Sequence, residues 1–198
     1  MDSSVSDPLA AVLESIIKTD DSVSMNVLNF VENVYSEHAY YESGAWIPQN
    51  SIIKYKPFTG ELPDFDFKDF QLPVKGRLTS SYGYRKSFQR FHRGIDIALN
   101  LGDTIKCVLP GVVTITGFEK GGYGRYVVVT HAGGIETLYA HLSSCLVNPG
   151  YKVKAGETLG IGGTTGNATG PHLHFETRYR GTAINPASWF NISELFTQ

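Results

Sequence analysis

From about residue 76 onward, pairs of glycines divide the chain into short segments. Of all features of the sequence, this spacing places the strongest limit on the fold. Gly121-Gly122, Gly133-Gly134 and Gly162-Gly163 separate runs that are rich in β-branched and aromatic side chains. Runs of this kind are typical of strands joined by tight turns. The pattern predicts a mainly β fold, built as an antiparallel sheet, a sandwich or a partly open barrel. We expect strands over residues 104–108, 111–116, 125–131, 135–140 and 172–178.

In the N-terminal third the apolar residues follow a helical spacing, which predicts a partly helical extension. Residues 7–17 begin with an Asp-Pro helix start and place their apolar side chains on one helical face. A second apolar stripe over residues 23–35 also fits a helix. Four prolines interrupt residues 42–73, which predicts an irregular connector. We therefore divide the chain into an extension at residues 1–71 and a β-rich domain at residues 72–198.

Composition excludes two classes of partner. The formal net charge of -2 over 198 residues gives no excess of positive charge, which a nucleic-acid-binding protein would need. Nor does the chain contain a run of about 18 apolar residues, so we expect no transmembrane segment. The first residues lack the features of a secretory signal, and we expect that a leader was removed ahead of them.

The chain has two cysteines, Cys107 and Cys145, which allow one disulfide. The sequence does not decide whether that disulfide forms. For Cys107 we favour the role of a small residue in the core.

Two short motifs offer metal-ligating side chains. If residues 91–98 are extended, His92 and Asp96 share one face, because side chains alternate along a strand. His172 and His174 share a face in the same way, and the apolar residues between them point to the core. Two such strands at a common groove would place these four side chains together. Alone, each spacing is weak evidence for a metal site.

The chemistry of these side chains favours zinc. Two imidazoles and one carboxylate suit Zn²⁺ at bond lengths of about 2.0–2.2 Å. Three protein ligands leave a fourth position for water, which is typical of a catalytic site. Bound zinc would lower the pKa of that water toward roughly 7 and polarise a substrate carbonyl.

Four longer motifs contain or flank these residues. They are GRLTSSYGYR at residues 76–85, HRGID at 92–96, YAHL at 139–142 and GNATGPHLHFE at 166–176. In order and spacing, over roughly residues 72–190, they resemble the motifs of the lysostaphin-type zinc endopeptidases, which act on peptidoglycan.

The resemblance implies a role for each matching residue. His92, Asp96 and His174 match the family's zinc ligands, so one Zn²⁺ is expected as cofactor. His141 and His172 match its two catalytic histidines. No HExxH motif supplies a glutamate base, so a neutral histidine would remove a proton from water and the second would stabilise the oxyanion or assist the leaving amine. Which histidine has which role stays open.

Other candidates surround these five residues. Tyr139, Asn167 and Thr169 are candidate substrate-binding residues, although ordinary packing explains Tyr139 equally well. Glu176 either orients a metal ligand or lies at the rim of the groove. We expect His131, at the end of a strand, to be structural.

The resemblance implies an endopeptidase that cleaves peptide bridges or cross-links of peptidoglycan, in the periplasm or outside the cell. We favour a stem-peptide D,D-endopeptidase over cleavage of a glycine bridge, although no motif separates the two. The alternative function is a non-catalytic regulator that binds the wall and activates other hydrolases. The presence of all five expected site residues argues against that alternative.

Overall fold

The computed structural model describes residues 67–188. The helices expected at residues 7–17 and 23–35, and most of the connector, lie outside the described residues. The boundary placed at residue 71 therefore stays a prediction. No helix among residues 67–188 is long and apolar enough to cross a membrane.

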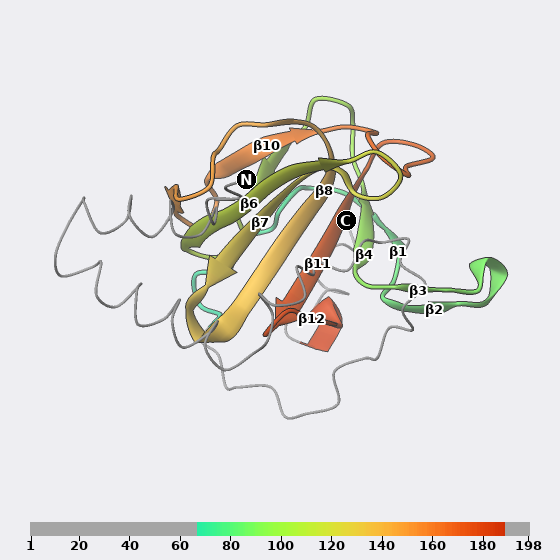
Figure 1. Ribbon diagram of the computed structural model, residues 1–198, viewed down its shortest axis with the longest axis horizontal. Helices are drawn as coiled ribbons and strands as arrows, with labels where there is room; N and C mark the ends of the chain where they lie inside the picture. Colours follow the sequence, from blue (N-terminus) through green and yellow to red (C-terminus); the bar gives the residue numbers. More distant parts are fainter. Residues whose placement is uncertain (1–66, 189–198) are drawn as a thin grey trace, which may run out of the picture. The chain divides into compact units, whose positions relative to one another are not determined.

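The described part of the chain is built almost entirely from antiparallel strands, as the glycine spacing predicts (Figure 1). The main sheet has the order β1-β4-β11-β8-β7-β6-β9; β12 adds to β11, and β10 joins β8 to β5. The sheet is open and does not close into a barrel, so the predicted fold class is confirmed. The strands are β1 Leu78–Ser80, β2 Gly83–Arg85, β3 Arg90–His92, β4 Ile95–Ala98, β5 Thr104–Lys106, β6 Gly111–Glu119, β7 Gly124–His131, β8 Ile135–Cys145, β9 Lys152–Val153, β10 Thr158–Gly162, β11 His172–Tyr179 and β12 Thr182–Ile184. Three 3-10 turns complete it: η1 Lys86–Phe88, η2 Ala132–Gly134 and η3 Pro186–Ser188.

Alternation along β11 separates the core from the functional face. Leu173 and Phe175 are buried in the main hydrophobic cluster, whereas His174 and Glu176 point to the other side of the sheet. Phe67 and Phe70 pack against the same cluster, although the predicted boundary assigns them to the extension. The core therefore fixes β11 and gives the site a rigid floor. The two cysteines are free thiols, so no disulfide contributes.

The segment around the first motif departs from the expected single strand. The chain forms β3 and β4 as separate strands, with Arg93 and Gly94 between them. β3 pairs with β2 in a two-stranded sheet, while β4 enters the main sheet between β1 and β11. A Cβ atom at Gly94 would lie 2.2 Å from the carbonyl oxygen of Phe175, so only glycine lets the bend pack against β11. The assumption that residues 91–98 are extended throughout does not hold, because this bend depends on contact with a distant strand.

Candidate metal centre

Three side chains each bring one donor atom to a common point. His92 Nε2 lies 3.0 Å from Asp96 Oδ1 and 3.1 Å from His174 Nδ1. The third side of this triangle, from His174 Nδ1 to Asp96 Oδ1, is 2.9 Å. A tetrahedral zinc ion with bonds of about 2.0–2.2 Å holds its ligands roughly 3.4 Å apart. The triangle therefore needs to open by only a few tenths of an ångström to hold such an ion.

The outer contacts of the two imidazoles direct their lone pairs into the triangle. His92 Nδ1–H donates to the carbonyl oxygen of Ser81 at 2.8 Å, and His174 Nε2–H donates to Glu176 Oε1 at 2.9 Å. Because these oxygens accept the ring protons, the other nitrogen of each neutral ring is left as an acceptor. Two imidazole lone pairs and a carboxylate oxygen then face one another. The donor set fits a divalent cation.

Glu176 is a fully buried carboxylate beneath the metal centre. Its Oε2 accepts from Arg178 Nε at 2.7 Å, and its Oε1 accepts from the Tyr123 hydroxyl at 2.7 Å. Burial opposes the charge, but Arg178 and His174 outweigh it and hold the pKa of Glu176 well below its usual range. Of the two roles expected for Glu176, the geometry matches orientation of a ligand and excludes a position at the rim.

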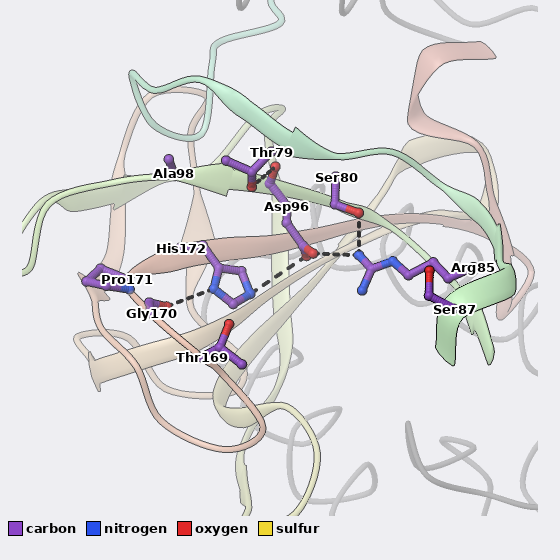
Figure 2. Close-up of a pocket in the computed structure, with 10 residues that line it drawn as sticks. All are labelled: Thr79, Ser80, Arg85, Ser87, Asp96, Ala98, Thr169, Gly170, Pro171 and His172. Atoms are coloured by element: carbon purple, nitrogen blue, oxygen red, sulfur yellow. Dashed lines mark hydrogen bonds and ion pairs between the residues drawn. The ribbon is translucent and has the colours of Figure 1, made fainter. Parts of the chain in front are cut away.

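Asp96 is held through both carboxylate oxygens (Figure 2). Oδ1 belongs to the triangle, and Oδ2 accepts from Arg85 Nη2 at 2.7 Å. The same Nη2 donates to Ser80 Oγ at 2.6 Å. Burial raises the pKa of Asp96, but hydrogen bonds to His174 and His92 outweigh it and leave the pKa well below its usual range. Asp96 therefore stays ionised and offers one oxygen to the centre.

Without a bound metal, His174 is protonated on both ring nitrogens at neutral pH. Burial lowers its pKa, yet its hydrogen bonds to Asp96 and Glu176 outweigh burial and raise the pKa to about 9. A site that binds a proton this firmly between two carboxylates also attracts a metal cation, which competes for the same lone pair.

His141 and His172 lie side by side next to the triangle, with ring centroids 4.7 Å apart. His141 Nδ1–H donates to the carbonyl oxygen of Thr165 at 2.8 Å, and His172 Nδ1–H donates to that of Gly170 at 2.9 Å. When neutral, each ring therefore keeps its Nε2 free as a proton acceptor. His172 Nε2 lies 3.8 Å from Asp96 Oδ1, and the His141 ring centroid lies 5.9 Å from that of His174.

His141 is neutral at physiological pH in this environment. Burial, followed by the charges of His174 and His172, lowers its pKa to about 4. A neutral imidazole with a free nitrogen can accept a proton from water or from a substrate group. This chemistry suits a general base.

The backbone of His141 is strained and is clamped by Thr165. His141 has φ of +64°, in the left-handed region that non-glycine residues seldom adopt. The Thr165 hydroxyl donates to the carbonyl oxygen of Leu142 at 2.7 Å and accepts from the Arg125 N–H at 2.8 Å. An added Cβ at Gly166 would lie 2.2 Å from the backbone nitrogen at the start of β7, so the loop packs closely there. The loop thus fixes the carbonyl that orients the His141 ring.

Tyr139 does not line the groove, and its expected role as a substrate-binding residue was wrong. Its side chain is fully buried on the core face, where it pairs across strands with Phe175. Its hydroxyl accepts from the Val108 N–H at 3.0 Å and contacts Thr137 Oγ1 at 2.9 Å. Phe175 was assigned to the apolar face from the sequence, so its cross-strand neighbour belongs there too.

Asn167 and Thr169 are exposed in the loop that leads into β11. Thr169 lines a pocket beside Asp96 and His172, whereas Asn167 contacts the β6–β7 turn through its backbone N–H. Their role in substrate binding stays a prediction. His131 is buried between the Pro110 carbonyl and Thr137 Oγ1, as expected of a structural histidine.

Sequence reasoning gave no role to four residues that support the site: Arg85, Tyr123, Thr165 and Arg178. Tyr123 and Arg178 hold Glu176, and Arg178 follows it by two residues on the same face of β11. That spacing was a usable signal for a buried ion pair. Arg85 and Thr165 act through partners 11 and 23 residues away, which no local pattern reveals.

The comparisons with known proteins agree on one family. The model of peptidase family M23 matches residues 90–186, which span all five expected site residues. A relative in Neisseria meningitidis, the DD-carboxypeptidase/endopeptidase Mpg, is 46% identical over 119 residues. That match covers 58% of this chain but 27% of the relative, so this chain spans about a quarter of that protein's length.

Two solved structures share the fold. The catalytic domain of the prophage-encoded M23 protein EnpA from Enterococcus faecalis is 32% identical, with a TM-score of 0.54; the match covers 68% of this chain and 97% of that one. A zinc-containing peptidase from Vibrio cholerae is 31% identical, with a TM-score of 0.55, over 60% of this chain and 39% of that one.

Proposed function

Because the chain belongs to peptidase family M23, we propose that it is a zinc-dependent endopeptidase that hydrolyses peptide cross-links of bacterial peptidoglycan. The observation that carries the proposal is the triangle of donor atoms from His92, Asp96 and His174, with His141 and His172 beside it. Zinc held by these three ligands would supply a Lewis acid that polarises the scissile carbonyl and activates water.

The chain's own residues divide the remaining work. His141, neutral and with a free Nε2, is the better candidate for the general base. His172 lies beside His141 and nearer to Asp96, and in its protonated form its Nε2–H is suited to donate to the developing oxyanion or to the leaving amine. Arg85 and Glu176 keep the ligands in place from outside the triangle.

We propose directly cross-linked stem peptides as substrates and the cell envelope, outside the cytoplasm, as the location. The similarity to a DD-carboxypeptidase/endopeptidase supports the choice of substrate, and the location follows from that substrate, because peptidoglycan lies in the cell envelope. EnpA and the Vibrio cholerae zinc-containing peptidase support the choice of reaction and metal.

The decisive experiment measures zinc content and release of peptide products from peptidoglycan on the same samples. The native chain is compared with His174→Ala and His141→Ala. We expect one bound zinc in the native chain and in His141→Ala, and none in His174→Ala. Both variants should release no cross-link products.

Two outcomes would contradict the proposal. Zinc retention in His174→Ala would place the metal elsewhere. A native chain that binds zinc and peptidoglycan but releases nothing would instead favour a regulator of other hydrolases.

A further inference from the structure

A pocket of about 600 Å³ adjoins the metal centre on the side of Asp96 and His172 (Figure 2). Residues from β1, the β2–β3 hairpin, β4 and the loop before β11 form its wall. Asp96 is the one carboxylate in this lining, and its Oδ2 already accepts from Arg85. The lining residues are Thr79, Ser80, Arg85, Ser87, Asp96, Ala98, Thr169, Gly170, Pro171 and His172.

Arg85 is the one arginine or lysine in this lining, and not all of its N–H donors are used in hydrogen bonds within the protein. Both of its hydrogen bonds, to Ser80 and Asp96, leave from Nη2. Its Nε is buried and has no hydrogen-bond partner in the described part of the chain, so the donors available to a ligand are those of the other terminal nitrogen. Figure 2 shows the other terminal nitrogen turned away from Asp96, toward the side bordered by Thr169 and His172. A guanidinium carries five N–H donors in a fixed fork, so it can hold a second acceptor beside the first.

The position of Arg85 limits which part of a substrate it reaches. Arg85 donates to Oδ2 of Asp96, and Oδ1 of the same carboxylate is one of the three donor atoms of the triangle. An extended peptide advances about 3.5 Å per residue, so a group held by Arg85 belongs to a residue beside the scissile bond. The exposed hydroxyls of Ser87 and Thr169 line the same space and can donate to a bound anion.

We propose that Arg85, with Ser87 and Thr169, forms a subsite for a free carboxylate on the carbon attached to the scissile nitrogen. The inference rests on the proposed peptidase function and narrows its substrate. A D,D-linked stem peptide can carry a carboxylate on that carbon, and the interior of a glycine bridge cannot. The subsite thus selects stem peptides over glycine bridges by charge.

The test uses two peptides that end in D-Ala-D-Ala and differ in one group, a free C-terminal carboxylate or a carboxamide. Cleavage of the last bond is measured with the zinc-loaded full chain. Because hydrogen bonds to a charged group contribute about 1.5–3 kcal/mol, we expect kcat/KM to be at least about 10-fold higher for the acid. The full-length His141→Ala variant, which removes the proposed base, should bind the acid at least about 10-fold more tightly in calorimetry.

Arg85→Gln is the informative variant, because the acid-to-amide ratio within it separates two effects. Loss of support for Asp96 lowers both rates together, whereas loss of the subsite brings their ratio close to 1. Arg125→Gln is the matched control: it removes an exposed positive charge that stacks on Phe118, outside the pocket lining. This control should keep the native ratio.

A native ratio near 1, with both peptides cleaved, would overturn the subsite and leave the proposed function intact. A high native ratio that persists in Arg85→Gln would also overturn it, because recognition would then lie elsewhere. If neither peptide is cleaved, the peptidase assignment is the one that fails. The calorimetric comparison of acid and amide then still decides whether the carboxylate is bound.

Discussion

His174 Nε2 lies 2.9 Å from Glu176 Oε1, so an imidazole of the metal triangle rests on a carboxylate with no solvent exposure. The two residues are separated by one position on β11 and share its functional face. The contact fixes both the orientation of the ring and the nitrogen that keeps its lone pair. Metal affinity should therefore depend on Glu176 although it does not touch the ion.

We expect Glu176→Gln to weaken zinc binding by about 10- to 100-fold, the range typical of such outer contacts. Glutamine keeps the shape and an acceptor oxygen but removes the charge. Competition with a chromophoric chelator measures the affinity. Glu157→Gln is the control: this carboxylate lies in the turn between β9 and β10, where it accepts from Tyr151 and the Lys154 N–H, and the variant should bind zinc like the native protein. Equal affinities in both variants would mean that Glu176 does not support the ligand.

The same substitution should also lower stability, because it removes one charge of a buried ion pair. Arg178 is 3% exposed and donates to Glu176 Oε2 at 2.7 Å. Removing one partner of a buried ion pair costs roughly 3–5 kcal/mol, and because the buried carboxylate of Glu136 also interacts with Arg178, we expect a loss toward the lower end of this range. Chemical unfolding of the zinc-free proteins measures this cost without interference from the metal. If the zinc-free Glu176→Gln protein is as stable as the native one, the ion pair does not stabilise the fold.

Thr165 positions His141 through its backbone carbonyl, and its hydroxyl holds that carbonyl in place. We expect Thr165→Val to lower kcat by roughly 10- to 100-fold, because small displacements of a catalytic group are costly. Zinc content should stay at one ion per chain. Thr165→Ser keeps the hydroxyl and should restore most of the rate.

A control for this prediction is Thr114→Val, which removes a hydroxyl on β6 that contacts Thr130. Its kcat should match that of the native enzyme. Equal rates for Thr165→Val and the native chain would contradict the positioning role of Thr165.

The HLH motif was predictable from sequence because it obeys a local rule. Side chains alternate along β11, so His172 and His174 face the site while Leu173 and Phe175 face the core. The mainly β fold followed from the glycine spacing for the same reason, since turns and strand propensity are local properties.

Other parts of the site depend on contacts between distant segments. The bend at Gly94 exists because β4 lies directly against β11, and this register cannot be read from residues 91–98 alone. Tyr139 was misplaced because its face is set by pairing with Phe175. Arg85 lies within a recognisable motif, but its role appears only once the β2–β3 hairpin brings it to Asp96.

Zinc itself should stabilise the fold if it binds the native triangle and not the unfolded chain. At a free zinc concentration 100 times Kd, the gain in unfolding free energy is about 2.7 kcal/mol. Thermal unfolding with and without a chelator measures the shift, which should vanish in His92→Ala. A stabilisation that persists in His92→Ala would assign the effect to another zinc site.

Acidification should destabilise the protein through His131, a buried histidine remote from the metal. Burial lowers the pKa of His131 to about 4, and its imidazole ring hydrogen-bonds to the Pro110 carbonyl and to Thr137 Oγ1. In the unfolded chain the imidazole takes up a proton below pH 6.5, while in the folded chain it does so only near pH 4. The unfolding free energy should therefore fall as pH drops from about 6.5 to about 4, by roughly 3 kcal/mol from this residue.

The measurement is the pH dependence of chemical unfolding for the native chain and for His131→Gln, both without zinc. His141 also has a lowered pKa and contributes a slope of its own, so the difference between the two curves isolates His131. Because glutamine does not titrate, the unfolding free energy of the variant should fall less than that of the native chain between about pH 6.5 and pH 4. This difference in slope does not depend on the stability of the variant at pH 7. Parallel curves would show that His131 takes up its proton equally readily in the folded and unfolded chains, against the burial seen here.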